Sequence, residues 1–249
     1  MKPIRLFCSD LDGTLAGERE GTLAFARHWS ALPDGQRPLL VYNSGRLVED
    51  ILAFCAQEGL PPADFVIGGV GTMLYAQSSP DLGEAYRKTL DRDFDVSRIE
   101  DLLGSMERLS RQPERYQHPL KSSWYLRDAE PDDLLEIESR LLVLGQTAKL
   151  VYSSRRDLDV LPGAADKGQA LDWLCAELGI PLSGVVVAGD TDNDRAMFEL
   201  DGIRGILPEN ALAELSSLTQ GRDGIFKGKG RAAWGVLDGL RHIGLIEPG

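Results

Sequence analysis

The sequence is poor in the residues that build disulfide frameworks, zinc sites and membrane spans. It has 3 cysteines and 3 histidines among 249 residues, and none of its apolar runs reaches the ~18 residues that a transmembrane helix needs. Because Cys8, Cys55 and Cys175 are odd in number and far apart, we expect reduced core residues rather than disulfides or a zinc site. No signal-peptide pattern follows Lys2 and Arg5, so we expect a cytoplasmic protein.

Positive charge is also scarce. The chain carries 27 Lys and Arg residues against 39 Asp and Glu residues, which gives a formal net charge of −12. No stretch is dense in Lys and Arg, so the sequence offers no footprint for nucleic acid or for an anionic membrane. We expect a small-molecule partner, no nucleic acid and no membrane, in a monomer or a small homo-oligomer. An anionic substrate would need local cations at its site.

Short apolar runs alternate with helical patterns along most of the chain. Apolar runs bounded by Gly, Pro, Asp or Asn predict strands at residues 4–9, 39–43, 65–68, 185–188 and 203–207. Helical patterns cover residues 22–31, 47–58, 167–178, 192–200, 211–218 and 231–243. This alternation predicts an α/β fold with a mostly parallel sheet and helices on both faces. In such sheets the chemistry gathers at the carboxyl ends of the strands.

The middle of the chain follows a different rhythm. It predicts a helix, a strand, a helix and two strands, at residues 96–109, 122–126, 131–144, 148–153 and 158–161. Turn-prone residues at 78–81 and 162–163 mark the crossings into and out of this region. We therefore predict an inserted α+β domain at 79–161, within a core formed by 1–78 and 162–249.

Two carboxylates follow the first predicted strand, in the segment Asp10-Leu11-Asp12-Gly13-Thr14. An aspartate at such a strand end can attack phosphorus, and the second can handle protons for the leaving group and for water. The pair suits a metal-assisted phosphoryl-transfer site. An ordinary Asp-Gly turn is the alternative.

Two further strand ends carry groups that suit a phosphate. Ser44 and Gly45 precede a predicted helix and offer a hydroxyl and backbone N–H groups, although Ser44 also fits a simple helix N-cap. Lys167 opens another helix, where the helix macrodipole opposes a cation, so its placement indicates an anion nearby. A solvated surface lysine is the alternative there.

The segment Gly189-Asp190-Thr191-Asp192-Asn193-Asp194 follows the buried run at 185–188. Its three carboxylates would face the first pair across the top of the sheet and would repel it without a cation. Ligands made only of oxygen suit Mg²⁺, whereas zinc is disfavoured because no Cys or His accompanies them.

The segments at 10–14 and 44–46, Lys167 and the segment at 189–194 resemble, in this order, the four motifs of the haloacid dehalogenase (HAD) phosphatase superfamily. The insertion at 79–161 is similar to the α/β cap domain, called C2B, of the Cof-like type IIB branch of that superfamily. The resemblance implies a HAD-like Rossmannoid core that carries such a cap. A narrower resemblance is to the sucrose-phosphate phosphatase group, which includes mannosylfructose-phosphate phosphatases. It is carried by residues 41–46, 69–72, 121–126, 152–154 and 157–162. Arg155 and Arg156 depart from that group, where a smaller, Gly-like residue is expected in the turn.

The resemblance implies Mg²⁺-dependent hydrolysis of a sugar phosphate, with a disaccharide phosphate of the sucrose-6-phosphate or mannosylfructose-phosphate type as the expected substrate. Asp10 would form an aspartyl phosphate and Asp12 would serve as acid and base. The other implied roles are phosphate binding by Ser44, Gly45 and Lys167, metal binding by Asp10, Asp190 and the Asp12 carbonyl, and orientation of metal waters and Lys167 by Asn193 and Asp194.

Selection of the leaving group is expected in the insertion. Lys121 and Ser122 are the candidates for sugar hydroxyl contacts, although Lys121 also fits a solvated strand-edge residue. Two other functions stay open from the motifs. One is a phosphomannomutase-like sugar phosphotransferase using the same Asp10 and Asp12 pair, and the other is a noncatalytic sugar-phosphate binding protein.

Overall fold

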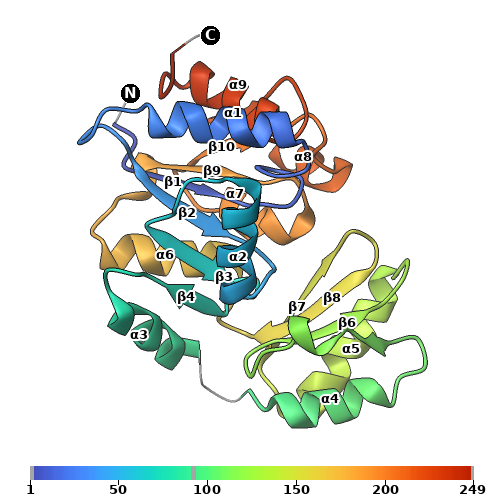
Figure 1. Cartoon of the computed structure of the whole chain (residues 1–249). Coiled ribbons are helices and arrows are strands. Elements are labelled where there is room, and N and C mark those ends of the chain that lie inside the picture. Colours follow the sequence, from blue (N-terminus) through green and yellow to red (C-terminus); the bar gives the residue numbers. More distant parts are fainter. Residues whose placement is uncertain (1–2, 91–93, 248–249) are drawn as a thin grey trace.

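The computed structural model describes residues 3–90 and 94–247. Its larger sheet has seven strands in the order β11-β10-β9-β1-β2-β3-β4 (Figure 1). These strands are β1 (Leu6–Ser9), β2 (Leu39–Asn43), β3 (Phe65–Gly68), β4 (Met73–Tyr75), β9 (Val185–Ala188), β10 (Arg204–Leu207) and β11 (Ile225–Lys227). All pairings are parallel except that of β3 with β4.

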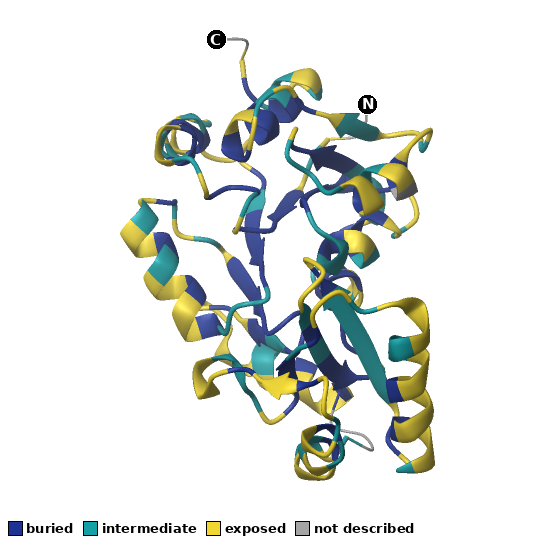
Figure 2. Ribbon diagram, turned by 90° about the vertical axis from the view of Figure 1, so that its right-hand side faces the viewer, coloured by how far each residue is buried: buried dark blue, intermediate teal, exposed yellow. Residues whose placement is uncertain are grey.

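The central strands of this sheet are buried on both faces, which explains their unbroken apolar sequences. In the register, Ser9 at the end of β1 lies between Tyr42 of β2 and Ala188 of β9. The residues that follow these three strands therefore meet at one edge. Figure 2 shows the buried strands and the exposed outer surfaces of the surrounding helices.

Helices cover both faces of the larger sheet. One core cluster joins the sheet to α1 (Arg19–Ser30), α2 (Val48–Glu58) and α9 (Ala233–His242). The cluster on the opposite face takes in α3 (Pro80–Leu90), α6 (Lys167–Glu177), α7 (Arg195–Phe198) and α8 (Ala213–Thr219). Cys8, Cys55 and Cys175 are buried free thiols, as the sequence predicted.

A second, antiparallel sheet has the order β5-β6-β8-β7 and lies beside the larger one (Figure 1). Its strands are β5 (Ser110–Arg111), β6 (Ser122–Tyr125), β7 (Ala148–Ser153) and β8 (Asp157–Pro162). The helices α4 (Val96–Gly104) and α5 (Pro131–Val143) share a separate apolar cluster with it, in which Trp124 and Leu158 are buried. We call this sheet with α4 and α5 the small unit.

The predicted α/β class with a mostly parallel sheet is confirmed by this topology. Some details differ: the helix predicted at 96–109 ends at Gly104, and that predicted at 192–200 divides into a 3-10 turn at Asp192–Asp194 and α7. The helix α3 falls within 79–161 but packs against β4 of the larger sheet. The ranges 1–78, 79–161 and 162–249 stay predictions, and residues 1–2, 91–93 and 248–249 within them lie outside the described residues.

Among the described residues, no helix is both long and apolar enough to cross a bilayer.

Candidate active site

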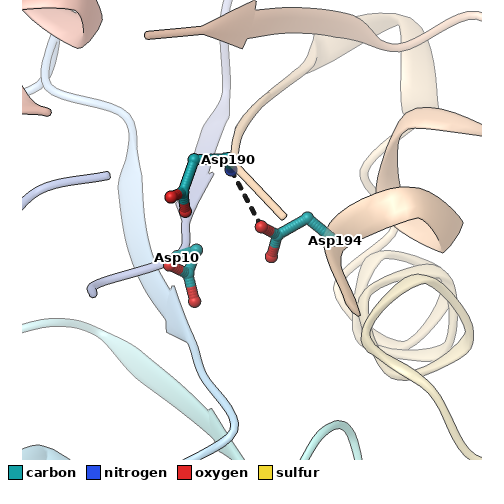
Figure 3. A group of neighbouring side chains, drawn as sticks. All are labelled: Asp10, Asp190 and Asp194. Atoms are coloured by element: carbon teal, nitrogen blue, oxygen red, sulfur yellow. Dashed lines mark hydrogen bonds between the residues drawn. The ribbon is translucent and has the colours of Figure 1, made fainter. Parts of the chain in front are cut away.

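Three carboxylates converge at the carboxyl edge of the larger sheet. Asp10 follows β1, and its N–H donates to the carbonyl of Ala188 at 3.0 Å, so it stays in line with the sheet. Asp190 and Asp194 come from the loop after β9. One ligand oxygen from each of the three acids lies within 4.8 Å of the others (Figure 3). The structure therefore brings the first and last predicted motifs together.

The turn after Asp10 is shaped to receive Asp190. Gly13 has a φ of +85°, and a Cβ there would lie 2.3 Å from the Oδ2 atom of Asp190. Thr14 donates its hydroxyl to Oδ1 of Asp190 at 2.9 Å. The Asp-Gly turn is thus present, but its glycine and threonine also seat a carboxylate from the other motif.

Lys167 is completely buried, so it is not a solvated surface lysine. Its Nζ atom donates to Oδ1 of Asp10 and to Oδ1 of Asp194, both at 2.6 Å. Burial lowers the pKa of this ammonium group, but Asp10 and Asp194 more than offset that effect and hold the pKa above its ordinary value. The side chain therefore remains a cation between two carboxylates.

The carboxylates at this edge carry more negative charge than Lys167 balances. Burial, followed by the charge of Asp194, raises the pKa of Asp190 to about 7. Burial also raises the pKa of Asp10 well above its ordinary value, although Lys167 opposes that effect. A cluster of buried oxygen ligands with excess negative charge fits a hard divalent cation and not a soft one.

Asp194 has both of its oxygens engaged by the protein. Oδ1 accepts from Lys167, and Oδ2 accepts the backbone N–H groups of Asp190 at 2.9 Å and Thr191 at 3.0 Å; the first of these backbone bonds is drawn in Figure 3. Asn193 accepts from the hydroxyl of Thr191 at 3.1 Å. These contacts hold the loop in place. The orienting roles of Asp194 and Asn193 stay predictions.

Ser44 is not the N-cap of a helix. The helix α2 begins at Val48 after Leu47, which makes no side-chain capping bond. The Oγ atom of Ser44 accepts the N–H of Arg46 at 3.3 Å, and its carbonyl accepts the N–H of Val70 at 3.1 Å. Ser44 and Gly45 line the same cleft as Asp10.

Arg46 holds Asp12 through two bonds, which the sequence did not predict. Its Nε atom donates to Oδ2 of Asp12 at 2.7 Å, and its second terminal nitrogen donates to Oδ1 at 2.9 Å. Arg46 is itself held by Asp50 at 2.8 Å and by the ring of Phe54, whose centroid is 4.0 Å from the guanidinium carbon. The only hint in the sequence was that Arg46 adjoins the predicted phosphate loop.

A cleft of about 380 Å³ opens above these residues and continues to the small unit. From the larger sheet it is lined by Asp10, Asp12, Ser44, Gly45, Arg46, Thr191 and Asn193. From the small unit it is lined by Gln112, Tyr116, Lys121, Tyr125, Ser153, Ser154, Arg156, Asp157 and Asp159. We call these two sets the phosphate wall and the outer wall. The outer wall is almost entirely polar.

Lys121 belongs to the outer wall, whereas Ser122 does not. Lys121 is 2% exposed, and its Nζ atom lies 3.1 Å from Oδ1 of Asp159 and donates to the carbonyl of Tyr116 at 3.1 Å. It is therefore not a solvated strand-edge residue. Ser122 points to the opposite face, where its hydroxyl accepts from the indole of Trp124 at 2.7 Å. The predicted sugar contact of Ser122 is corrected on this ground, because neighbouring residues of a strand face opposite ways.

Comparison with known proteins gives the family of this chain. Residues 3–244 match the model of the family described as sucrose-6F-phosphate phosphohydrolase. The chain belongs to this family. It is 52% identical to the mannosylfructose-phosphate phosphatase of Agrobacterium fabrum (strain C58), over 98% of this chain and 99% of that protein.

Comparison with solved structures shows that this chain has the HAD fold. The sucrose-phosphatase of Synechocystis sp. PCC6803, solved with sucrose and phosphate, matches with a TM-score of 0.87 and 25% identity, over 97% of this chain and 98% of that one. The HAD subclass IIB sugar phosphatase BT4131 has the same fold, with a TM-score of 0.69 and 13% identity over 97% and 100% of the two chains. The predictions of a HAD-like fold and of a phosphoric monoester hydrolase are confirmed.

Proposed function

We propose that this phosphatase hydrolyses a disaccharide phosphate of the sucrose-6-phosphate or mannosylfructose-phosphate type, with Mg²⁺ as its cofactor. The observation that carries the proposal is the cleft, in which a wall of phosphate-handling residues faces a polar wall on the small unit. A sugar leaving group presents many hydroxyls, which a wall of carboxylates, amides and cations can bind. The similarity to the mannosylfructose-phosphate phosphatase supports the same substrate class.

On the phosphate wall, Asp10 is the nucleophile. Its carboxylate attacks phosphorus to form an aspartyl phosphate, while Lys167, the Ser44 hydroxyl and nearby backbone N–H groups hold the phosphoryl oxygens. Asp10, Asp190 and the carbonyl of Asp12 would hold Mg²⁺, which when bound neutralises phosphate charge and so lets an anionic nucleophile approach. Asp194 holds Lys167 in place, through the 2.6 Å bond between them.

Asp12 is the proton carrier in this mechanism. As the bond from Asp10 to phosphorus forms, the bond from phosphorus to the sugar oxygen breaks, and Asp12 in its carboxylic acid form gives its proton to that oxygen. The Asp12 carboxylate then takes a proton from the water that hydrolyses the aspartyl phosphate, which restores the acid form. In the resting arrangement both oxygens of Asp12 accept bonds from Arg46. A proton can be delivered to the leaving group only after at least one of these bonds opens, so we place that opening at substrate binding.

On the outer wall, Lys121 and Asp159 form the central pair for sugar hydroxyls. Their 3.1 Å ion pair leaves donor and acceptor positions that border the cleft. Arg156 lies nearby, fixed by bonds of 3.1 and 2.8 Å to Asp157 and with its guanidinium carbon 5.5 Å from the ring centroid of Tyr125. We therefore place the sugar that lacks the phosphate against this surface.

Hydrolysis of a panel of phosphate esters tests the proposal. The panel contains sucrose 6-phosphate, mannosylfructose phosphate, hexose 1- and 6-phosphates and an aryl phosphate, with and without Mg²⁺. We expect kcat/KM for at least one disaccharide phosphate to exceed that for every hexose phosphate by about 10-fold or more, because unfilled polar groups in the cleft penalise the smaller substrates. Chelation of Mg²⁺ should abolish phosphate release.

Two results of the same panel would contradict the proposal. Conversion of a hexose 1-phosphate to its isomer, without free phosphate, would indicate a sugar phosphotransferase. Binding of a sugar phosphate with no Mg²⁺-dependent phosphate release would indicate a noncatalytic binding protein.

Replacing Lys121 separates sugar recognition from phosphate chemistry. For Lys121→Ala we expect kcat/KM on the disaccharide phosphate to fall by about 10- to 100-fold, because a hydrogen bond to a charged group is lost. Activity on the aryl phosphate should change by less than about 3-fold, since that ester has no sugar to bind. Steady-state kinetics on both esters give the comparison.

A matched control is Arg155→Ala, which removes an exposed cation on the same unit whose partner, Asp128, lies outside the cleft. It should leave both activities near the wild-type values. Lys121→Met keeps most of the buried side-chain volume if the alanine variant is unstable. Equal losses on the two esters would mean that Lys121 does not contact the sugar.

A further inference from the structure

We infer that Asn210 is a positioning residue that sets the affinity for Mg²⁺ by holding Asp190. The inference rests on the proposed use of Mg²⁺. Asn210 lies in the loop after β10, beside the carboxylate of Asp190. Its Nδ2 atom donates to the carbonyl of Gly13 at 2.9 Å and lies 3.4 Å from Oδ2 of Asp190.

The orientation of this amide is determined by its other end. The Oδ1 atom of Asn210 accepts the backbone N–H of Ala232 at 2.6 Å. Since an N–H group can only donate, this bond places the carbonyl oxygen on the side of Ala232 and directs the amide nitrogen towards the site. Ala232 has φ 45° and ψ −131°, a conformation that costs energy for a residue with a Cβ. The strained residue is therefore the same one whose N–H orients Asn210.

The same loop also holds the main chain of Asp190. Leu212 donates its N–H to the carbonyl of Asp190 at 2.8 Å. Behind the loop, Glu209 donates its N–H to the carbonyl of Gly230 at 2.9 Å, and its side chain accepts the N–H of Gly230 at 3.0 Å. The loop therefore links the segment at 230–232 to Asp190 and to the turn at Gly13.

With Thr14 on one oxygen and Asn210 near the other, the Asp190 carboxylate has little freedom to rotate. A carboxylate that is already in place loses less freedom when it binds a cation, so the cation binds more tightly. Loss of such an outer partner costs about 10- to 100-fold in metal affinity. Asn210 contacts neither the phosphate nor the sugar in the mechanism above, so its effect should act through the metal.

The test is Mg²⁺ binding to Asn210→Ala, measured by titration calorimetry in the absence of substrate. We expect the Kd for Mg²⁺ to rise by about 10- to 100-fold. The rate at saturating Mg²⁺ should recover to within about 3-fold of wild type, because the chemical groups are unchanged. Asn210→Ser, which keeps a polar group in the same space but cannot span both contacts, serves as a second variant if the alanine protein is unstable.

Glu209→Gln is the matched control, because it weakens the same loop at a contact that does not reach the site. Its Kd for Mg²⁺ should equal that of the wild type. An unchanged Kd in both Asn210 variants, or an equal increase in Glu209→Gln, would overturn the inference. Mg²⁺ binding is measured without substrate, so the comparison of Kd values still holds if the protein does not hydrolyse a disaccharide phosphate. A wild-type protein that binds no Mg²⁺ would overturn the inference itself.

Discussion

An Asp10→Asn protein is expected to release phosphate at least about 10⁴-fold more slowly than the wild type. The amide has almost the same shape as the carboxylate but lacks the anionic oxygen that attacks phosphorus. Phosphate release from the best ester of the panel, at saturating Mg²⁺, gives the comparison. A purified variant that released phosphate at the wild-type rate would contradict the assignment of Asp10 as nucleophile.

The same variant should keep its fold, and without metal it should melt at a temperature no lower than that of the wild type. Burial raises the pKa of the Asp10 carboxyl, so this group stabilises the folded state when it is neutral and loses that contribution as the pH rises through its folded pKa. At neutral pH the asparagine avoids this cost. Asp192→Asn is the matched control, because Asp192 lies beside the site but does not line the cleft; it should retain near wild-type activity.

Replacement of Asp12 by alanine is expected to reduce turnover of the sugar phosphate by about 10²-fold or more. Both chemical steps need the proton carrier when the leaving group is a sugar alcohol. An aryl leaving group needs little protonation, so the first step on an aryl phosphate should survive while hydrolysis of the aspartyl phosphate stays slow. We therefore expect a burst of aryl alcohol equal to the enzyme concentration, measured by rapid quench, before slow turnover.

The control for Asp12→Ala is Asp50→Asn. Asp50 is the other carboxylate bound to Arg46, at 2.8 Å, and it does not line the cleft. If the loss in Asp12→Ala came only from freeing Arg46, both variants would lose activity to a similar degree. Wild-type turnover without a burst in Asp12→Ala would show that another group carries the proton.

The parts of the fold that depend on local pattern could be predicted from the sequence. The buried apolar strands β1, β2 and β9 each end in a polar motif, and parallel strands bring such ends together. The prediction that Asp10, Ser44 and Asp190 share one edge follows from that rule, whereas Lys167 follows β8 of the second sheet, so its place beside Asp10 does not. The helix α3 was missed because its packing depends on the short antiparallel strand β4, which has only 3 residues.

Other parts of the site depend on contacts that no local pattern specifies. Lys121, Ser122 and Ser123 are all polar, so alternation could not tell which of them face the cleft. Arg46 reaches Asp12 across 34 positions of sequence, and Asn210 reaches Gly13 across 197. Such pairs arise from the way strands and loops are arranged in space, which the motifs do not encode.

The two walls of the cleft also bear on how this enzyme can change. The phosphate wall comes from residues 10–46 and 191–193, whereas the outer wall comes from residues 112–159. With the roles proposed for the two walls, we therefore expect that a substitution on the outer wall can alter the accepted alcohol without a compensating change near Asp10. On the proposed roles of the two walls, we expect that exchange of the strands β6 and β8 would change which sugar is accepted and would leave the residues proposed to attack phosphorus in place.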